Sequence, residues 1–289
     1  MDPNIHYKLR DLFFAIIIFL MITGTFYYVF IILEAPIQFS LLMILIFLLI
    51  LHVFEVYLLI PKHNQIILEH LQRQIDLQKW HYKQTASLFS IFSLLDINHP
   101  VKMVDSGYEV SPEFAHLIIS TILEKKPGTV LELGSGLSTI LAGYALKKVG
   151  KGRLVSIDHQ KQFTDSVNND IKKHSLQQYA EVIHSPLKEI SFNGRSWLWY
   201  DQDKIKVRDI DLLVIDGPPG YLQKLSRYPA LPVLFSKLSS NAVILLDDGY
   251  RSDEKTMVDL WLMEFKTLDC SFHKLGKGAF VLTKSTTLP

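Results

Sequence analysis

Long apolar runs occupy the start of the chain, whereas the rest alternates between short apolar and amphipathic segments. Residues 12–33 form a run of 22 residues without a charged side chain, and residues 39–60 form a second run that contains only His52 and Glu55 as ionisable groups. A helix of either run would be about 33 Å long at 1.5 Å per residue, which matches a bilayer's hydrocarbon core. The sequence therefore predicts a two-helix transmembrane hairpin over residues 1–61.

Basic residues predict the orientation of this hairpin. Lys8 and Arg10 precede the first run, Lys62 and Arg73 follow the second, and the connecting turn contains no basic residue. Cytoplasmic flanks of membrane spans carry an excess of Lys and Arg, so we expect a multi-pass membrane protein with two spans and with both termini in the cytoplasm. A cleavable signal peptide is disfavoured, because the first run is long and a second run follows at once.

A more polar helical pattern follows over residues 62–97. Leu68, Leu71 and Ile75 have coiled-coil spacing, but the pattern fades at Gln78. Coiled coils are recognised by roughly three to four heptads, and this segment offers fewer. We predict a helical linker, which either lies on the membrane or on its own domain, or forms a homodimer through a stalk.

The remaining residues, 98–289, alternate in the manner of an α/β domain. Short apolar runs predict strands at residues 129–133, 154–157, 180–183, 210–215, 242–246, 271–275 and 279–283, with helices in most of the gaps. This order predicts a Rossmann-like, doubly wound seven-stranded sheet, entered through a helix that Ser111 caps and Pro112 opens. Asn193-Gly194 predicts a β-hairpin after the third strand, whose aromatic residues either line a substrate wall or pack on the sheet edge.

Composition restricts the classes of function. Hydrophobic residues make up 48% of the chain and the mean hydropathy is +0.19, which is consistent with a membrane segment beside one α/β domain. The net charge is only +1, and no stripe of basic residues with interleaved aromatics indicates a nucleic-acid partner. Cys270 is the single cysteine, so no internal disulfide can form, as expected for a cytoplasmic domain.

A glycine turn after the first predicted strand is the strongest local motif. The sequence reads Glu132-Leu133-Gly134-Ser135-Gly136-Leu137-Ser138-Thr139. The two glycines lack Cβ atoms, so backbone N–H groups at the start of the next helix can approach a ligand closely. A dinucleotide fingerprint would need a third glycine where Thr139 stands, and Glu132 suits an ammonium but would repel a pyrophosphate.

A carboxylate follows the second predicted strand, about twenty residues past the glycines. Asp158 ends this strand, in the position from which a carboxylate can accept both hydroxyls of a ribose. Together with the glycine turn, this acid predicts a nucleoside ligand that carries no phosphates.

These residues resemble the class I S-adenosylmethionine-dependent methyltransferases, and within them a bacterial, membrane-anchored group. The resemblance covers roughly residues 98–282 and also includes Ser156-Ile157-Asp158-His159, Ile215-Asp216-Gly217-Pro218-Pro219-Gly220 and Leu246-Asp247-Asp248. It implies S-adenosylmethionine as the cofactor, and the predicted cofactor-binding residues are Glu132, Gly134, Ser135, Gly136, Thr139, Asp158, His159 and Asp216. Many members carry an Asp beside the adenine, but that place here reads His184-Ser185-Pro186-Leu187, so this contact is not transferred.

Three acids at the ends of the fourth and fifth strands are the candidate catalytic residues. Asp216, Asp247 and Asp248 should meet at one edge of the sheet. Metal-dependent O-methyltransferases resemble this arrangement, so the three are also predicted Mg²⁺ ligands, and the ion would lower the pKa of an acceptor hydroxyl. In the alternative, Asp216 contacts the cofactor's amino group, Asp247 accepts backbone N–H bonds and Asp248 caps the next turn.

The predicted function is a membrane-anchored methyltransferase that methylates a hydroxyl group at the cytoplasmic face. The acceptor would be a small molecule, a lipid-linked compound or a glycan precursor, and Arg227 borders its expected pocket. Arg251 could face the substrate too, although a surface or packing role is favoured. Two alternatives are an NAD-dependent Rossmann oxidoreductase, which Glu132 and the missing third glycine disfavour, and a membrane scaffold with a non-catalytic nucleoside-binding domain.

Overall fold

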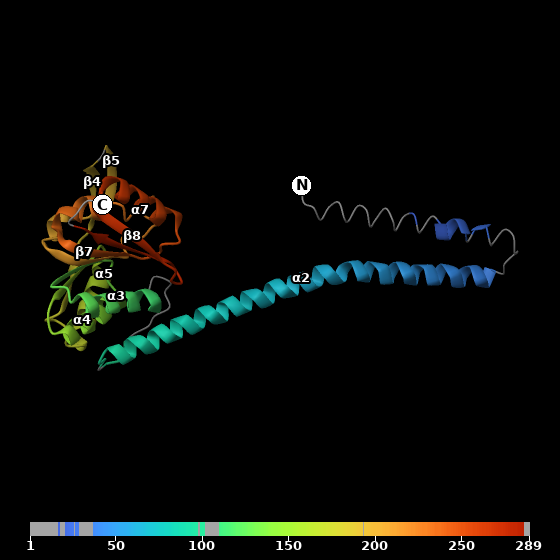
Figure 1. Ribbon diagram of the computed structural model, residues 1–289, viewed down its shortest axis with the longest axis horizontal. Coiled ribbons are helices and arrows are strands. Elements are labelled where there is room, and N and C mark those ends of the chain that lie inside the picture. The colour runs from blue at the N-terminus through green and yellow to red at the C-terminus, as the bar shows by residue number, and fades with distance from the viewer. Residues whose placement is uncertain are drawn as a thin grey trace. The chain divides into compact units, whose positions relative to one another are not determined.

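The computed structural model describes residues 17, 21–25, 27–28, 37–97, 99–101, 110–192 and 194–285. The chain divides into two compact units, Met1–Asp76 and Leu77–Pro289, which are described separately (Figure 1). The second unit contains every predicted site residue.

One long helix, α2, spans Ile37–Leu94. It continues through Pro61 although proline lacks the N–H that a helix interior needs, so the predicted boundary at residue 61 is not a helix break. Among the described residues, this is the one helix long and apolar enough to cross a membrane. The first predicted span, residues 12–33, lies mostly outside the described residues, so the two-helix hairpin stays a prediction.

The last turns of α2 pack within the second unit. Ile91 is buried in the domain core, and the side-chain amide of Gln84 donates a hydrogen bond of 2.7 Å to Oε2 of Glu113. This part of the predicted linker therefore lies on its own domain. The stripe that includes Leu68 and Leu71 is exposed in this structure, and the homodimer stays a prediction.

A seven-stranded sheet forms the centre of the second unit. Its strands are β1 (Thr129–Leu133), β2 (Arg153–Asp158), β3 (Ala180–His184), β6 (Ile210–Ile215), β7 (Leu238–Leu246), β8 (Leu268–His273) and β9 (Ala279–Lys284). Their order is β3-β2-β1-β6-β7-β9-β8. The first five are parallel, while β9 runs antiparallel to both neighbours. The predicted Rossmann-like sheet is confirmed, and the antiparallel strand makes it mixed.

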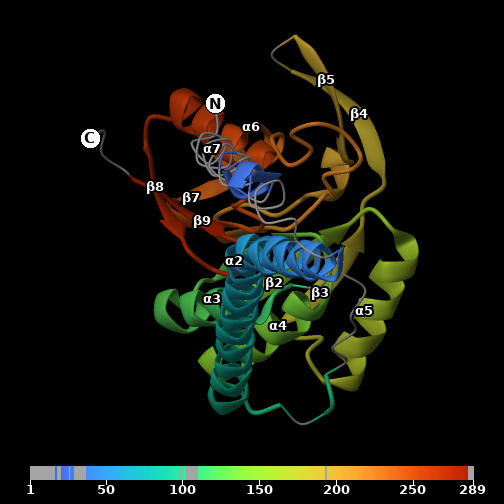
Figure 2. The same ribbon diagram turned by 90° about the vertical axis from the view of Figure 1, so that its right-hand side faces the viewer.

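Helices cover both faces of this sheet (Figure 2). They are α3 (Pro112–Lys125), α4 (Leu137–Val149) and α5 (Lys161–Lys173) on one face, and α6 (Ala230–Leu234) and α7 (Ser252–Glu264) on the other. Alternate residues of β6 divide between the two cores, since Val214 packs on the side of α3 to α5 and Ile215 on the side of α6 and α7. A parallel sheet that is buried on both faces explains the nearly continuous apolar strands of the sequence.

The start of α3 has the predicted cap. Ser111 is the N-cap residue, and its Oγ accepts a hydrogen bond of 3.2 Å from the N–H of Phe114. Pro112 occupies the first helical position, where its missing N–H costs no hydrogen bond.

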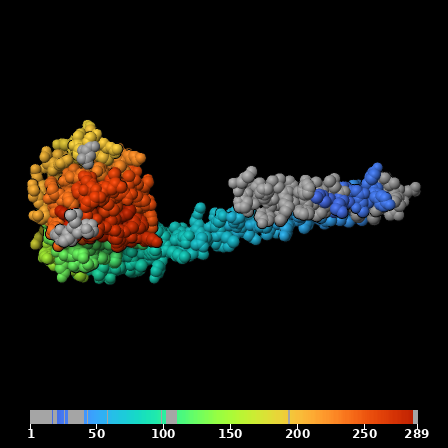
Figure 3. Space-filling model, turned by 45° about the horizontal axis from the view of Figure 1, so that its top comes forward, coloured from blue at the N-terminus to red at the C-terminus, as the bar shows by residue number. Residues whose placement is uncertain are grey.

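The predicted hairpin is also present, as β4 (Leu187–Phe192) and β5 (Arg195–Tyr200), and it projects from the second unit (Figure 2, Figure 3). Trp199 is fully buried, and the ring of Trp197 lies 5.0 Å from that of Tyr228. The amide of Gln223 donates to the carbonyl of Leu198 over 2.9 Å and accepts from its N–H over 3.0 Å. The hairpin is therefore tied to the segment that follows β6.

Candidate cofactor and acceptor site

The turn after β1 needs the first of its two glycines. Gly134 has a φ of +95°, and a Cβ atom there would lie 3.1 Å from both the carbonyl carbon and the carbonyl oxygen of Asp216. Its N–H donates to the carbonyl of Ile157 over 2.9 Å, which fastens the turn to the end of β2. Gly136 precedes the first turn of α4, and its N–H donates to Oγ1 of Thr139 over 3.0 Å. The sequence thus places a tight turn in front of a helix N-terminus.

Glu132 and Thr139 lie beneath this turn. Glu132 is 1% exposed, and its carboxylate accepts a hydrogen bond from the Thr139 hydroxyl. Burial raises the pKa of Glu132, and hydrogen bonds from neighbouring hydroxyl groups partly oppose this rise. Neither residue is among the described residues that line the cavity below, so their direct contact with a cofactor stays a prediction.

The carboxylate of Asp158 faces the same turn from the end of β2. Oδ2 accepts hydrogen bonds from the N–H and the hydroxyl of Ser135, over 3.0 and 2.9 Å. Oδ1 accepts from the N–H of Gln160 over 2.8 Å. Neutral donors thus orient this carboxylate, and Oδ1 retains a lone pair for a ligand.

His159 directly follows this acid. Its Nδ1 lies 3.7 Å from Oδ1 of Asp158. Burial lowers the pKa of His159, although the charge of Asp158 opposes this shift. The neutral ring is therefore favoured at neutral pH, and a neutral ring is suited to packing against a base.

One cavity, of about 1620 Å³, joins the turn to the ends of β6 and β7. Seven of the predicted site residues line it, namely Gly134, Ser135, Gly136, Asp158, His159, Asp216 and Asp248. Arg227, Arg251, Tyr200 and Lys277 line it as well. The structure therefore brings most of the predicted cofactor-binding residues and two of the candidate catalytic acids to one cavity.

The three candidate catalytic acids meet beside this cavity, and Asp216 and Asp248 line it while Asp247 does not. Asp216, Asp247 and Asp248 each offer a carboxylate oxygen, and these oxygens lie within 4.8 Å of one another. Burial is the main cause that raises the pKa of Asp216 to about 6 and that of Asp247 to about 8. A pKa of about 8 favours the neutral form of Asp247 at neutral pH, and the carboxylates that remain ionised in this buried place require positive charge nearby.

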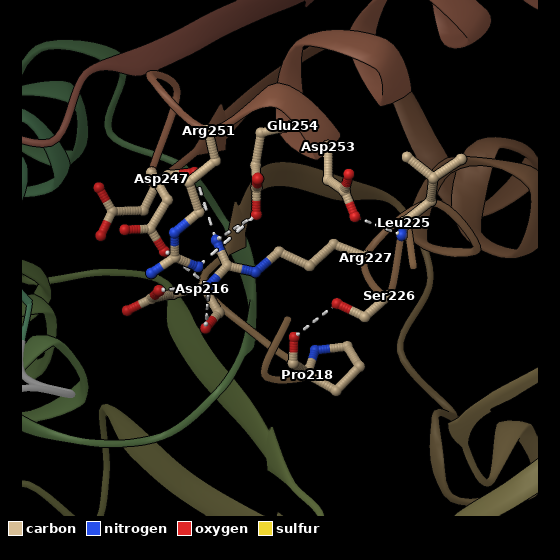
Figure 4. A network of polar contacts seen from close by, with 10 residues as sticks. Asp216, Pro218, Leu225, Ser226, Arg227, Asp247, Arg251, Asp253 and Glu254 are labelled. Atoms are coloured by element: carbon tan, nitrogen blue, oxygen red, sulfur yellow. Dashed lines mark hydrogen bonds and ion pairs between the residues drawn. The ribbon is translucent and has the colours of Figure 1, made fainter. Parts of the chain in front are cut away.

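Arg227 supplies that charge from the segment after β6 (Figure 4). The residue is 3% exposed. Its Nη2 donates to Oδ2 of Asp248 over 2.9 Å and to Oδ1 of Asp216 over 3.2 Å. The guanidinium also donates to the backbone carbonyls of Asp216 and Asp247, each over 3.2 Å. Arg227 thereby joins the ends of β6 and β7.

A second arginine closes the cluster from outside. Nη1 of Arg251 lies 2.9 Å from Oδ2 of Asp248, and its side chain is 52% exposed. Glu254, at the start of α7, lies 3.8 Å from both guanidinium groups. The sequence favoured a packing role for Arg251 and did not identify its contact with Asp248.

These residues do not fit the predicted magnesium site. Mg²⁺ needs near-octahedral oxygen ligands at about 2.0–2.1 Å. Two of the three carboxylates already accept hydrogen bonds from a buried guanidinium, whose charge would repel a nearby dication. Among the described residues, only Oδ1 of Asp247 is a buried carboxylate oxygen without a hydrogen-bond partner, and one oxygen does not make a magnesium site.

Comparison with known proteins relates the central part of this unit to one protein family. Residues 131–249 match the family model described as a methyltransferase domain, which covers the glycine turn, Asp158, Asp216 and the Asp247-Asp248 pair. The sequence matches no curated protein.

Two solved structures share the fold. A putative O-methyltransferase from Klebsiella pneumoniae aligns with a TM-score of 0.52 and 13% identity, over 72% of this chain and 99% of that one. An SAH-bound methyltransferase of Podospora anserina, PaMTH1, aligns with a TM-score of 0.50 and 15% identity, over 64% and 83% of the two chains. The second unit therefore contains a segment that matches a methyltransferase domain, and it shares the fold of these two solved methyltransferase structures.

Proposed function

We propose that the protein is a membrane-anchored O-methyltransferase that methylates a hydroxyl group of a small-molecule, lipid-linked or glycan acceptor at the cytoplasmic membrane face. The observation that carries this proposal is the single cavity between Asp158 and the acidic edge at Asp216 and Asp248. Its volume of about 1620 Å³ exceeds that of ordinary ligand pockets, which is roughly 300–1,000 Å³. An acceptor can therefore lie beside the cofactor.

Different residues of the cavity would bind different parts of the cofactor and the acceptor. The turn at Gly134 and Gly136 would hold the methionine part of the cofactor, Asp158 the ribose hydroxyls, and Asp216 the ammonium group. S-adenosylmethionine held there would supply a methyl group that is activated for transfer to an acceptor oxygen at the far end. Asp216 or Asp248 would accept the proton of the acceptor hydroxyl. Alignment of oxygen, carbon and sulfur supplies most of the acceleration in such a transfer.

Separate observations support oxygen as the accepting atom and support the membrane anchor with a cytoplasmic domain. The Klebsiella pneumoniae relative in fold is described as a putative O-methyltransferase, which favours oxygen as the accepting atom. The apolar part of α2 supports a membrane anchor, and basic residues at both ends of the predicted hairpin support a cytoplasmic domain.

Cofactor binding is the first test. Calorimetry on the full-length protein in detergent should show binding of S-adenosylmethionine, and no binding of NAD. Binding of NAD alone would overturn the proposal and would favour the oxidoreductase.

Turnover is the second test. The protein is incubated with methyl-labelled S-adenosylmethionine, a lipid extract and a small-molecule extract, and the labelled product is identified. Label on a hydroxyl oxygen supports the proposal. Cofactor binding without any labelled acceptor would favour the non-catalytic scaffold.

Topology is the third test. Reporters fused before Asp2 and after Pro289 should both behave as cytosolic, and a tag at Gln38 should be accessible from outside. A Gln38 tag that is protected in intact cells would overturn the two-span arrangement.

A further inference from the structure

We infer that Arg227 takes the place of a divalent cation at the acidic edge of the sheet, so that this site positions its carboxylates without a metal. The inference rests on the proposed function only for the location of the acceptor. The ionic contacts that carry it are present whichever acceptor is used.

Arg227 contacts two of the carboxylates that a bound cation would use as ligands. One nitrogen, Nη2, lies 3.2 Å from Oδ1 of Asp216 and 2.9 Å from Oδ2 of Asp248. A metal ion between these two side chains would compete with this guanidinium for the carboxylates of Asp216 and Asp248. Because a guanidinium has donors and no acceptor, it bridges two carboxylates as a cation does, in a fixed plane.

The same group also fastens the backbone. Arg227 donates to the carbonyls of Asp216 and Asp247, which are the residues that directly follow β6 and β7. A metal bound to side-chain oxygens alone would leave these carbonyls to other donors. Arg227 therefore binds the backbone at the ends of β6 and β7 as well as the carboxylates of Asp216 and Asp248.

The segment around Arg227 holds it in place. The Ser226 hydroxyl donates to the carbonyl of Pro218 over 3.2 Å, and the N–H of Leu225 donates to Oδ2 of Asp253 over 2.9 Å. On the other side, the Tyr228 hydroxyl donates to Oε2 of Glu264 over 2.8 Å. Since both neighbours of Arg227 are bonded to the rest of the domain, the backbone from which the guanidinium reaches the cluster is held in place.

The charge count agrees with this assignment. Asp216, Asp248 and Glu254 form ion pairs with Arg227 or Arg251, so three carboxylates surround two guanidinium groups. Removal of the buried cation would leave the carboxylates with one arginine that is half exposed to water. A divalent cation could then occupy the freed oxygens.

Binding of Mn²⁺, a spectroscopic substitute for Mg²⁺, tests the inference without an acceptor. We expect the electron paramagnetic resonance signal of free Mn²⁺ to remain undiminished when the full-length protein is added with S-adenosylmethionine. The Arg227→Met variant should bind about one equivalent of Mn²⁺ and reduce that signal. Arg227→Lys keeps a positive charge and should leave Mn²⁺ free.

Matched variants separate this effect from a general change of charge. Arg153→Met removes an exposed ion pair with Glu181 on β3, outside the cavity, and should not bind Mn²⁺. Stoichiometric Mn²⁺ binding by the wild type that is lost in Asp247→Asn would overturn the inference. So would a folded Arg227→Met variant that leaves Mn²⁺ free.

Calorimetry completes the test if Arg227→Met does not fold. The melting temperature of the wild type should be the same in excess EDTA as in excess Mg²⁺, because an ion bound to the folded state would stabilise it. A melting temperature that is clearly higher in Mg²⁺ and loses this rise in Asp247→Asn would overturn the inference. Failure of the proposed function gives a different result, which is the absence of cofactor binding under both conditions.

Discussion

The two ends of the cavity hold their carboxylates in opposite ways. At the end of β2, Asp158 accepts hydrogen bonds from neutral donors only, the N–H groups of Ser135 and Gln160 and the Ser135 hydroxyl. At the ends of β6 and β7, three acids meet around Arg227. A single carboxylate at the edge of a cavity can stay ionised on neutral donors, whereas a buried cluster requires an opposite charge.

The two ends also differ in how far apart in the sequence their contacting residues lie. Ser135, Asp158 and Gln160 lie within 26 consecutive positions, at the ends of the adjacent strands β1 and β2. The cluster instead joins Asp216 to Glu254, across two strands and the start of α7. Variants at the cluster should therefore affect the stability of the domain, and variants at the turn should mainly affect the cofactor.

The largest expected effect follows from Arg227→Met. Removal of one partner from a buried ionic network leaves uncompensated charge, so we expect the free energy of unfolding to fall by about 3–5 kcal/mol. Denaturant unfolding of the full-length protein in detergent measures this change. In the control, Arg251→Met, the side chain is half exposed and the loss should stay below about 1 kcal/mol. Equal losses in the two variants would remove the distinction between the buried and the exposed arginine.

Asp158→Ala tests the opposite end of the cavity. The expected result is a loss of about tenfold to a hundredfold in affinity for S-adenosylmethionine, because hydrogen bonds to a charged group contribute about 1.5–3 kcal/mol. Calorimetry measures the affinity. Ser135→Ala keeps the carboxylate and should weaken binding less. A folded Asp158→Ala variant with unchanged affinity would exclude Asp158 from the cofactor site.

Gly134→Ala and Gly150→Ala separate backbone strain from steric contact. Both glycines have positive φ, so alanine at either position should cost about 1–2 kcal/mol of stability. Only at Gly134 would the new Cβ meet the backbone of Asp216, while no atom lies within 4 Å at Gly150. We expect weaker cofactor binding in Gly134→Ala alone, and comparable weakening in Gly150→Ala would contradict this assignment.

The smallest expected effect concerns the hairpin. Gln223→Ala removes two hydrogen bonds to Leu198 at an exposed position, with an expected loss of about 1 kcal/mol of stability and unchanged cofactor affinity. Gln223→Glu keeps the acceptor and loses the donor, so its effect should lie between those of the wild type and Gln223→Ala. A marked fall in cofactor affinity would show that the hairpin shapes the cavity.

The sheet and the glycine turn could be predicted from the sequence because both depend on local sequence patterns. Apolar runs separated by turn residues determine the strands, and Gly134 and Asp158 occupy fixed places at strand ends. Arg227 was harder to assign because its partners are 11 to 27 positions away, in segments without regular spacing. One signal was available, since Arg227 is the only charged residue in the stretch 225–236.

Glu132 illustrates a second limit. The sequence pairs it with the glycine turn as a ligand for the cofactor's ammonium. In β1 it alternates with Leu131 and Leu133, which pack on the side of α6 and α7, so its side chain points to the opposite face, toward Thr139 of α4. Strand alternation thus accounts for the position of this acid beneath the turn, and its contact with the cofactor stays a prediction.

The attachment of Arg227 to two backbone carbonyls has a consequence for motion. Outward movement of the segment after β6 would have to break bonds at the ends of both strands together. Opening of this segment should therefore be as rare as opening of the sheet, and its amide protons should exchange with deuterium as slowly as those of the strands. Acceptors would then reach the methyl group without opening of the segment after β6 on the timescale of turnover.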